Sequence, residues 1–272
     1  MAAVSSAPPM SDLSGVGLLA GAANVIMQLA QPPVGYGVAE STVESGQLFR
    51  HPLKRTRTTL TYLAVALMGD DEDRRRYRRA VDGSHARVRS GPDSPVAYNA
   101  FDTDLQLWVA ACLYVGVEDV YSRLHGPLTG AEADAFYRQG ARLGTTLQVG
   151  EDQWPPDRAA FGHYWEKGVG GAHIDSTVRA YLDDVVMLRF LPWPAPALFG
   201  GLNRFVTTGF LPQPFRDRMH YRWGARDQRR FDACISVVAA VDRWMPVVVR
   251  QFPFNACLWD VRRRARAGMP LV

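Results

Sequence analysis

The stretch Ser84-His85-Ala86-Arg87-Val88 decides how this chain is interpreted. Tyr77 and Val81 lie two turns and one turn upstream of His85, and with Ser84, His85 and Val88 they form one stripe of an α-helix. The stripe is largely apolar, so the imidazole of His85 points where a core side chain would point. A buried imidazole needs a partner. Two alternatives stay open here: a hydrogen-bonded core histidine and a metal ligand.

The bulk composition is that of one globular domain. The chain has 272 residues, 47% of them hydrophobic, and a net charge of +4 at pH 7. The excess of positive charge is modest and is not gathered into a dense patch, so a nucleic-acid partner is not expected. No signal peptide or transmembrane segment is recognisable, which predicts a cytoplasmic protein and leaves peripheral contact with a membrane open.

The three cysteines are far apart in the sequence and form no C-x-x-C pair. This pattern disfavours both a disulfide framework and a zinc site. A reducing compartment fits it better.

Hydrophobic periodicity predicts helices throughout and no confident strand. We expect an all-α fold: a tail over residues 1–14 and one multi-helix domain over residues 15–272. Pro32-Pro33 is expected to end the first helix, with Val34–Ser45 as a glycine-bearing connection. Asp102 is expected to cap a helix whose apolar face has five members: Leu105, Trp108, Val109, Cys112 and Leu113.

Common catalytic signatures are absent from the sequence. It contains no P-loop, no G-x-S-x-G, no H-E-x-x-H and no E-x-x-H, and no two histidines are spaced i,i+4. A haem needs less: one axial imidazole, an apolar pocket and groups for the propionates. His85 meets the first requirement. The candidates for the other two are Leu60, Leu63, Trp108 and Val109 for the pocket, and Arg55, Arg87 and Arg89 for the propionates.

The ordered motifs resemble the family of oxygenase MpaB and the rubber oxygenase (latex-clearing protein) catalytic domain, also called DUF2236. Together they span roughly residues 15–265. The matching features are Leu29-Ala30-Gln31-Pro32-Pro33-Val34, Val38-Ala39-Glu40-Ser41, His51-Pro52 with Arg55 and Thr59, Gly69, His85-Ala86-Arg87-Val88, Tyr98-Asn99-Ala100-Phe101-Asp102, Leu107-Trp108-Val109, Leu211-Pro212 with Arg216, Trp223, Pro246 with Arg250, and Pro253.

The resemblance implies a globin-like core that binds one b-type haem through its iron, with His85 as the proximal ligand. It places Arg55 and Thr59 beside the haem. A glutamate in the preceding loop is the proposed base of latex-clearing members, and Glu40 lies in the matching stretch. Those members carry a lysine before the threonine that can cap the iron. Here that position is Thr58, which implies an open or water-bound distal side.

The leading hypothesis is therefore a haem-dependent oxygenase or oxidase that uses dioxygen on an apolar substrate, such as an isoprenoid or another lipid. The alternatives are a non-catalytic haem protein (a gas sensor or carrier) and a purely structural or lipid-binding helical domain. The site residues have alternatives too. Arg55 and Thr59 could be a buried polar pair that ties two helices together, Glu40 a loop cap, and Trp108 a core residue.

Overall fold

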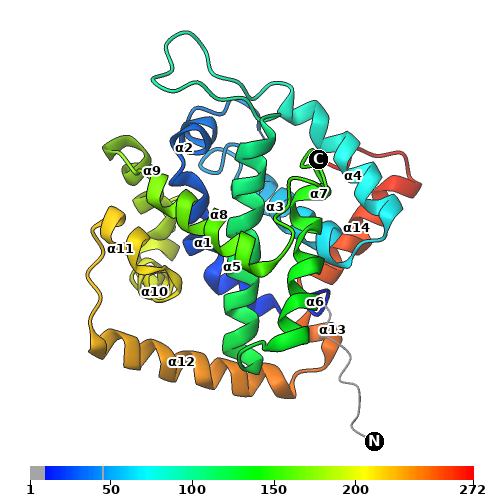
Figure 1. Ribbon diagram of the computed structural model, residues 1–272. Coiled ribbons are helices and arrows are strands. Elements are labelled where there is room, and N and C mark those ends of the chain that lie inside the picture. Colours follow the sequence, from blue (N-terminus) through cyan, green and yellow to red (C-terminus); the bar gives the residue numbers. More distant parts are fainter. Residues whose placement is uncertain (1–9, 45) are drawn as a thin grey trace, which may run out of the picture.

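The computed structural model describes residues 10–44 and 46–272, and within these ranges it contains helices and no strand. The only β-type pairing there is an isolated bridge between Arg89 and Asn99. The all-α single-domain fold expected from the sequence is thus confirmed (Figure 1). A globin-like core stays a prediction. None of the helices in the described ranges has both the length and the apolarity needed to cross a bilayer.

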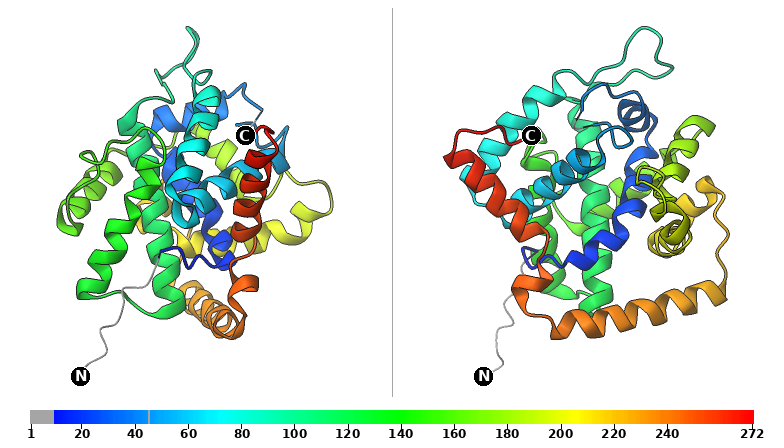
Figure 2. Two further views of the ribbon diagram at one scale, coloured as in Figure 1. Left: turned by 90° about the vertical axis from the view of Figure 1, so that its right-hand side faces the viewer. Right: turned by 180° about the vertical axis from the view of Figure 1, so that it is seen from behind.

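Helix α5 (Thr103–His125) runs through the middle of the molecule and separates two hydrophobic cores (Figures 1 and 2). Its start is fixed locally: the Asp102 carboxylate accepts the backbone N–H groups of Asp104 and Leu105 at 2.9 and 3.2 Å. Trp108 and Cys112 enter the first core, whereas Leu107 and Tyr114 enter the second. A helix that is buried on opposite sides is apolar nearly all round.

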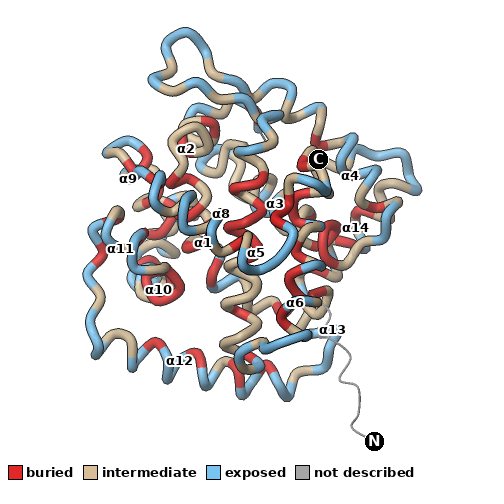
Figure 3. The backbone as a smooth tube through the Cα atoms, viewed as in Figure 1, coloured by how far each residue is buried: buried red, intermediate tan, exposed pale blue. Residues whose placement is uncertain are grey.

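The remaining helices surround α5. On the side of the first core lie η1 (Gly15–Ala20), α1 (Gly21–Leu29), α2 (Pro32–Ala39), α9 (Ser176–Val186), α10 (Ala195–Phe210), α11 (Gln213–Met219) and α12 (Ala225–Trp244). On the side of the second core lie α3 (Pro52–Met68), α4 (Asp71–His85), α6 (Gly130–Gly140), α7 (Arg142–Thr145) and α14 (Phe254–Arg266). Helix α8 (Arg158–Gly171) contacts both cores, the first through Val169 and the second through Phe161. Buried residues concentrate around α5 (Figure 3). The short α13 (Val247–Arg250) joins α12 to α14.

The expectation for the segment after Pro32-Pro33 was wrong in part. Residues 32–39 form helix α2, and the two prolines occupy its first turn instead of opening a loop. Proline is tolerated there because the first N–H groups of a helix have no partner within it. Residues 40–44 of the expected connection do lie outside a helix.

The expected tail of residues 1–14 lies outside the described residues up to residue 9. From Met10 onward the chain packs against the body: Met10 and Leu13 are buried. The Asp12 carboxylate accepts from the Arg250 guanidinium at 2.6 Å. The Ser14 hydroxyl donates to the buried Asp242 carboxylate at 2.5 Å.

Three contacts fix helix α4, which ends at His85. The Asp70 and Asp73 side chains and backbones form a reciprocal cap at its start. The Tyr77 hydroxyl donates to the Thr58 carbonyl of α3 at 2.9 Å. The Arg262 guanidinium of α14 donates to the Asp73 carboxylate at 2.7 Å. These contacts set the position of α4 along α3, and with it the position of His85.

Replacing Asp70 by alanine should lower the midpoint temperature of unfolding by roughly 2–4 °C, because α4 loses its cap. Asp70→Asn, which keeps an acceptor, should change it little. The hydrogen bond from the Asp73 N–H lowers the pKa of Asp70 below its ordinary 3.8. The stabilisation is therefore present above pH 3.8 and lost as the pH falls through the folded-state pKa.

Unfolding curves at neutral and at acidic pH check both parts of this prediction. The wild type should lose more stability on acidification than Asp70→Asn. Equal losses in the two proteins would contradict the role given to the charge.

Candidate functional site

His85 lies at the end of α4 and lines a cavity of about 270 Å³ between α3, α4, α5 and α7. Its Nδ1 atom is buried and has no hydrogen-bond partner among the described residues. Burial lowers the pKa of the imidazole below 6.5, which favours the neutral form. A neutral imidazole beside a cavity, with a ring nitrogen that has no hydrogen-bond partner, is suited to bind a metal ion.

A ring contact and an amide network hold the surroundings of His85. The Phe101 ring packs edge-on against the imidazole with centroids 6.1 Å apart. The side-chain amide of Gln148 donates to Asp82, one turn before His85 on α4. The same Gln148 side chain raises the pKa of His85 and so offsets part of the decrease caused by burial. The Gln148 backbone N–H in turn donates to Gln106 of α5 at 3.0 Å. Gln148 was missed by sequence reasoning because it lies in a connection far along the chain.

Arg55 and Thr59 of α3 line the same cavity as His85. The Arg55 guanidinium makes no hydrogen bond or ion pair with any residue that the structure describes, and burial lowers its pKa. The Thr59 hydroxyl donates to the Arg55 carbonyl at 3.2 Å, within its own helix. Neither side chain therefore ties two helices together. A half-buried guanidinium that lines a cavity and has no partner there is suited to an anionic group of a ligand.

Thr58 also lines the cavity of His85, at the position where the resemblance implies a lysine in other members. Its hydroxyl donates to the Lys54 carbonyl at 2.9 Å, so the side chain turns back onto its own helix. It presents no charged group to the cavity.

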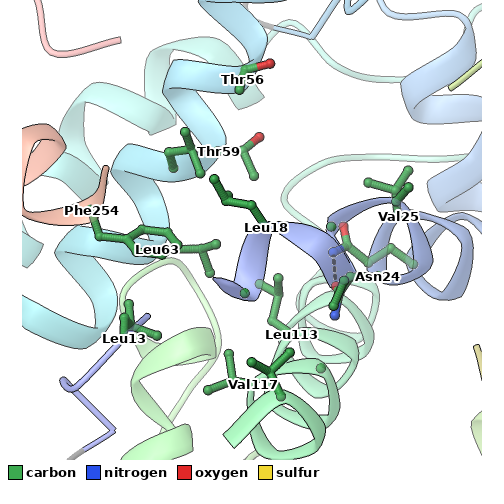
Figure 4. Close-up of a pocket in the computed structure, with 18 of the residues that line it drawn as sticks. Leu13, Leu18, Asn24, Val25, Thr56, Thr59, Leu63, Leu113, Val117 and Phe254 are labelled. Carbon is green, nitrogen blue, oxygen red and sulfur yellow. Dashed lines mark hydrogen bonds between the residues drawn. The ribbon is translucent and has the colours of Figure 1, made fainter. Parts of the chain in front are cut away.

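A second, larger cavity of about 410 Å³ adjoins the first. The residues that line both cavities are Gln28, Val38, Arg55, Thr59 and Leu113. Figure 4 shows Leu18, Leu63, Leu113, Val117 and Phe254 arranged around the larger cavity, with Thr59 at its edge. Its volume falls in the range of small-molecule pockets, about 300–1,000 Å³. The mainly apolar lining fits an apolar ligand.

Glu40 lies outside both cavities. It follows α2, is exposed, and lines a separate surface pocket with Arg87 and Arg89. The Tyr98 hydroxyl donates to its carboxylate at 2.9 Å. Tyr98 lines the cavity of His85 as well as the surface pocket, so it connects Glu40 to the site. The motif Tyr98-Asn99-Ala100-Phe101-Asp102 gave no indication of that role.

Glu40→Gln should lower the pKa of Tyr98 towards its ordinary value of 10. Burial, together with the hydrogen bond to the Glu40 carboxylate, raises this pKa to about 12. The substitution removes the effect of the Glu40 carboxylate on the pKa of Tyr98 and leaves the effect of burial. Ultraviolet titration of the tyrosines in wild type and variant measures the change. Glu44→Gln is the matched control, since Glu44 pairs with Lys54 at 2.9 Å. Superimposable curves for wild type and Glu40→Gln would contradict the prediction.

Trp108 does not line either cavity. Its indole N–H donates to the carbonyls of Met27 and Gln28 at 3.2 and 3.1 Å, and its ring stacks on Trp165 with centroids 5.3 Å apart. Gly168 accommodates the ring, because a Cβ there would lie 2.3 Å from it. Trp108 thus packs in the first core, between α5 and α8, away from the side of α5 that faces His85.

Among the described residues, no group of three or more His, Cys, Asp and Glu side chains is arranged to hold a metal ion. His85 is the histidine that lines the smaller cavity, and His125 lines the larger one. A sequence model of the family "ER-bound oxygenase mpaB/B'/Rubber oxygenase, catalytic domain" matches residues 10–240. The chain belongs to this family. It therefore carries an oxygenase catalytic domain and is an enzyme.

Two curated relatives match most of the chain. They are the uncharacterized proteins Mb2261 of Mycobacterium bovis and Rv2237 of Mycobacterium tuberculosis. Each is 53% identical over 255 residues, which is 94% of this chain and 100% of the relative. No solved structure matches the chain.

Proposed function

We propose that the protein is a haem-dependent oxygenase that acts with dioxygen on an apolar substrate, and that His85 ligates the haem iron. The observation that supports this most is the buried, unpartnered Nδ1 of His85 in a cavity that also holds the unpartnered guanidinium of Arg55. Membership of the oxygenase family supplies the reaction class.

The side chains of the smaller cavity are of the types that hold a b-type haem. His85 offers the axial imidazole, and Arg55 offers a positive charge for a propionate. Apolar side chains of α4, α5 and the segment after α7 line the rest, among them Val81, Leu105, Val109 and Leu147. The haem, when bound, supplies an iron that binds and activates dioxygen.

The larger cavity is where we place the substrate. Its mainly apolar lining favours a lipophilic molecule, such as an isoprenoid or another lipid. Arg55 and Thr59 lie in the wall that the two cavities share, so they sit between cofactor and substrate. The hydrogen-bonded Tyr98 and Glu40 link the smaller cavity to the surface pocket, and this pair can move a proton between them.

The absorption spectrum of the purified protein after haem supplementation, with a pyridine haemochrome assay, tests the cofactor. A Soret band and a b-type haemochrome are the expected result. Protein that stays colourless would contradict the proposal and favour a structural or lipid-binding domain.

Oxygen consumption by the haem-loaded protein with candidate lipids tests the activity. Uptake that depends on the lipid is expected. Haem binding without uptake for any lipid would favour a gas sensor or carrier. Glu40→Gln should slow uptake without changing the haem content, and unchanged uptake would remove Glu40 from the proton path.

A further inference from the structure

Helix α12 lies along one end of the molecule, with one side against the body and the other exposed (Figures 1 and 3). Its inward side carries Phe231, Ile235, Ala239 and Asp242, all of which are buried. The residues of the outward side recur every three or four positions: Arg226, Arg230, Ala233, Val237, Val241 and Trp244. This face is therefore basic at its first two turns and apolar from there to its end.

The apolar half of this face is unusually exposed. The exposed fraction is 65% for Val237, 56% for Val241 and 87% for Trp244. Beyond the helix, Val248 of α13 and the following Phe252 are 73% and 63% exposed. A run of large apolar side chains that faces water in this way marks an interaction surface. We call the outward face of α12 together with Val248 and Phe252 the α12–α13 surface.

The charged residues on the outward face of α12 are arginines, whereas the carboxylates of Asp227 and Asp232 on the same helix accept from the Gly224 N–H at 3.0 Å and from the Gln228 amide at 2.8 Å. Arg226 and Arg230, with the neighbouring Arg229 and Arg243, are exposed and form no ion pair with any carboxylate in the described part of the chain. Between residues 233 and 252 the acidic residue is Asp242, which is buried and bonded to Ser14. The surface thus offers free positive charge next to apolar side chains, without exposed negative charge in its apolar half.

We propose that the α12–α13 surface docks onto an anionic lipid membrane. Lipid phosphates would pair with the free arginines, and Trp244, Val248 and Phe252 would enter the boundary between headgroups and acyl chains. Basic residues beside exposed tryptophan and phenylalanine are the composition of interfacial helices. A second copy of the same surface matches it less well, because its apolar half exposes no carboxylate to the arginines. The docking is independent of the haem chemistry.

Co-sedimentation of the full-length protein with vesicles tests this proposal. Vesicles of phosphatidylcholine with phosphatidylglycerol should bind the protein, and high salt should weaken the binding because it screens the arginines. Phosphatidylcholine alone should bind it markedly less. Equal binding to both compositions, or none to either, would overturn the proposal.

Variants separate the two halves of the surface. Trp244→Ser with Phe252→Ser should lower the vesicle partition coefficient about tenfold or more. Arg226→Gln with Arg230→Gln should lower it about fivefold for each arginine, with a weaker dependence on salt. Leu53→Ser, at an equally exposed apolar position (84%) at the start of α3, should bind as the wild type does. Circular dichroism confirms that each variant is folded.

Gel filtration tests the alternative that a second copy of the chain covers this surface. A dimer that Trp244→Ser dissociates, in a protein that does not bind vesicles, would overturn membrane docking and assign the surface to a second copy of the chain. A protein whose oligomeric state is the same in wild type and Trp244→Ser, and whose vesicle binding falls in that variant, is the expected result.

Discussion

If His85 ligates a haem as proposed, His85→Ala should abolish the Soret band and reduce the haem content of the purified protein to near zero, and this is the largest effect we expect. The imidazole is the one side chain of the smaller cavity that combines an unpartnered ring nitrogen with a position at a helix end. Without it the cavity retains apolar contacts and Arg55 but no strong iron ligand. Haem content per chain, measured by pyridine haemochrome, checks the prediction.

Two further variants serve as a control and as a rescue experiment for His85→Ala. His163→Ala removes an exposed histidine from another helix, α8, and should retain full haem content. His85→Gly should lose the haem spectrum and regain it when free imidazole is added, because the ligand position is restored without the covalent link. A full Soret band in His85→Ala, with a normal circular dichroism spectrum, would show that His85 is not the ligand.

Arg55→Leu should stabilise the haem-free protein and weaken its binding of haem. In the haem-free protein the guanidinium is a half-buried charge without a partner among the described residues, so its removal should raise the free energy of unfolding, by at most about 1 kcal/mol. Haem affinity should fall at least tenfold, about 1.4 kcal/mol or more, because a propionate loses its ion pair. Urea unfolding and haem titration measure the two effects.

Arg50→Leu is the matched control for Arg55→Leu. Arg50 is exposed, precedes α3 and does not line either of the two cavities. Its replacement should leave both the unfolding free energy and the haem affinity unchanged. If Arg55→Leu made the haem-free protein less stable, the arginine would support the fold, and its assignment as a binding residue for an anion would be contradicted.

The ends of several helices could be predicted from the sequence because a cap is a local interaction. Asp102, Asp157 and Asp175 cap α5, α8 and α9, and in each case the carboxylate accepts a backbone N–H two or three residues later. The boundary at Pro32-Pro33 could not be predicted in the same way. A proline pair is compatible with the end of one helix and with the first turn of the next, and packing decides between them.

The apolar face expected on the helix after Asp102 is divided in two by the fold. Leu105, Val109 and Leu113 line the cavity of His85, whereas Trp108 and Cys112 point into the other core. Sequence periodicity cannot separate these sets, because α5 is apolar on opposite sides. The role of Trp108 as a core residue follows from the helices that pack against it.

The sequence by itself determined that this chain is all-α, that His85 lies on the inward side of α4, and that Arg55 and Thr59 lie on one side of α3. These properties depend on residues within a few helical turns, and helical periodicity and capping act over that range. Only the tertiary structure decided that His85 and Arg55 line one cavity without partners, that Gln148 and Tyr98 lie beside them, and that α12 exposes its apolar side. The physical reason is that a cavity and an exposed face are properties of how distant helices pack together.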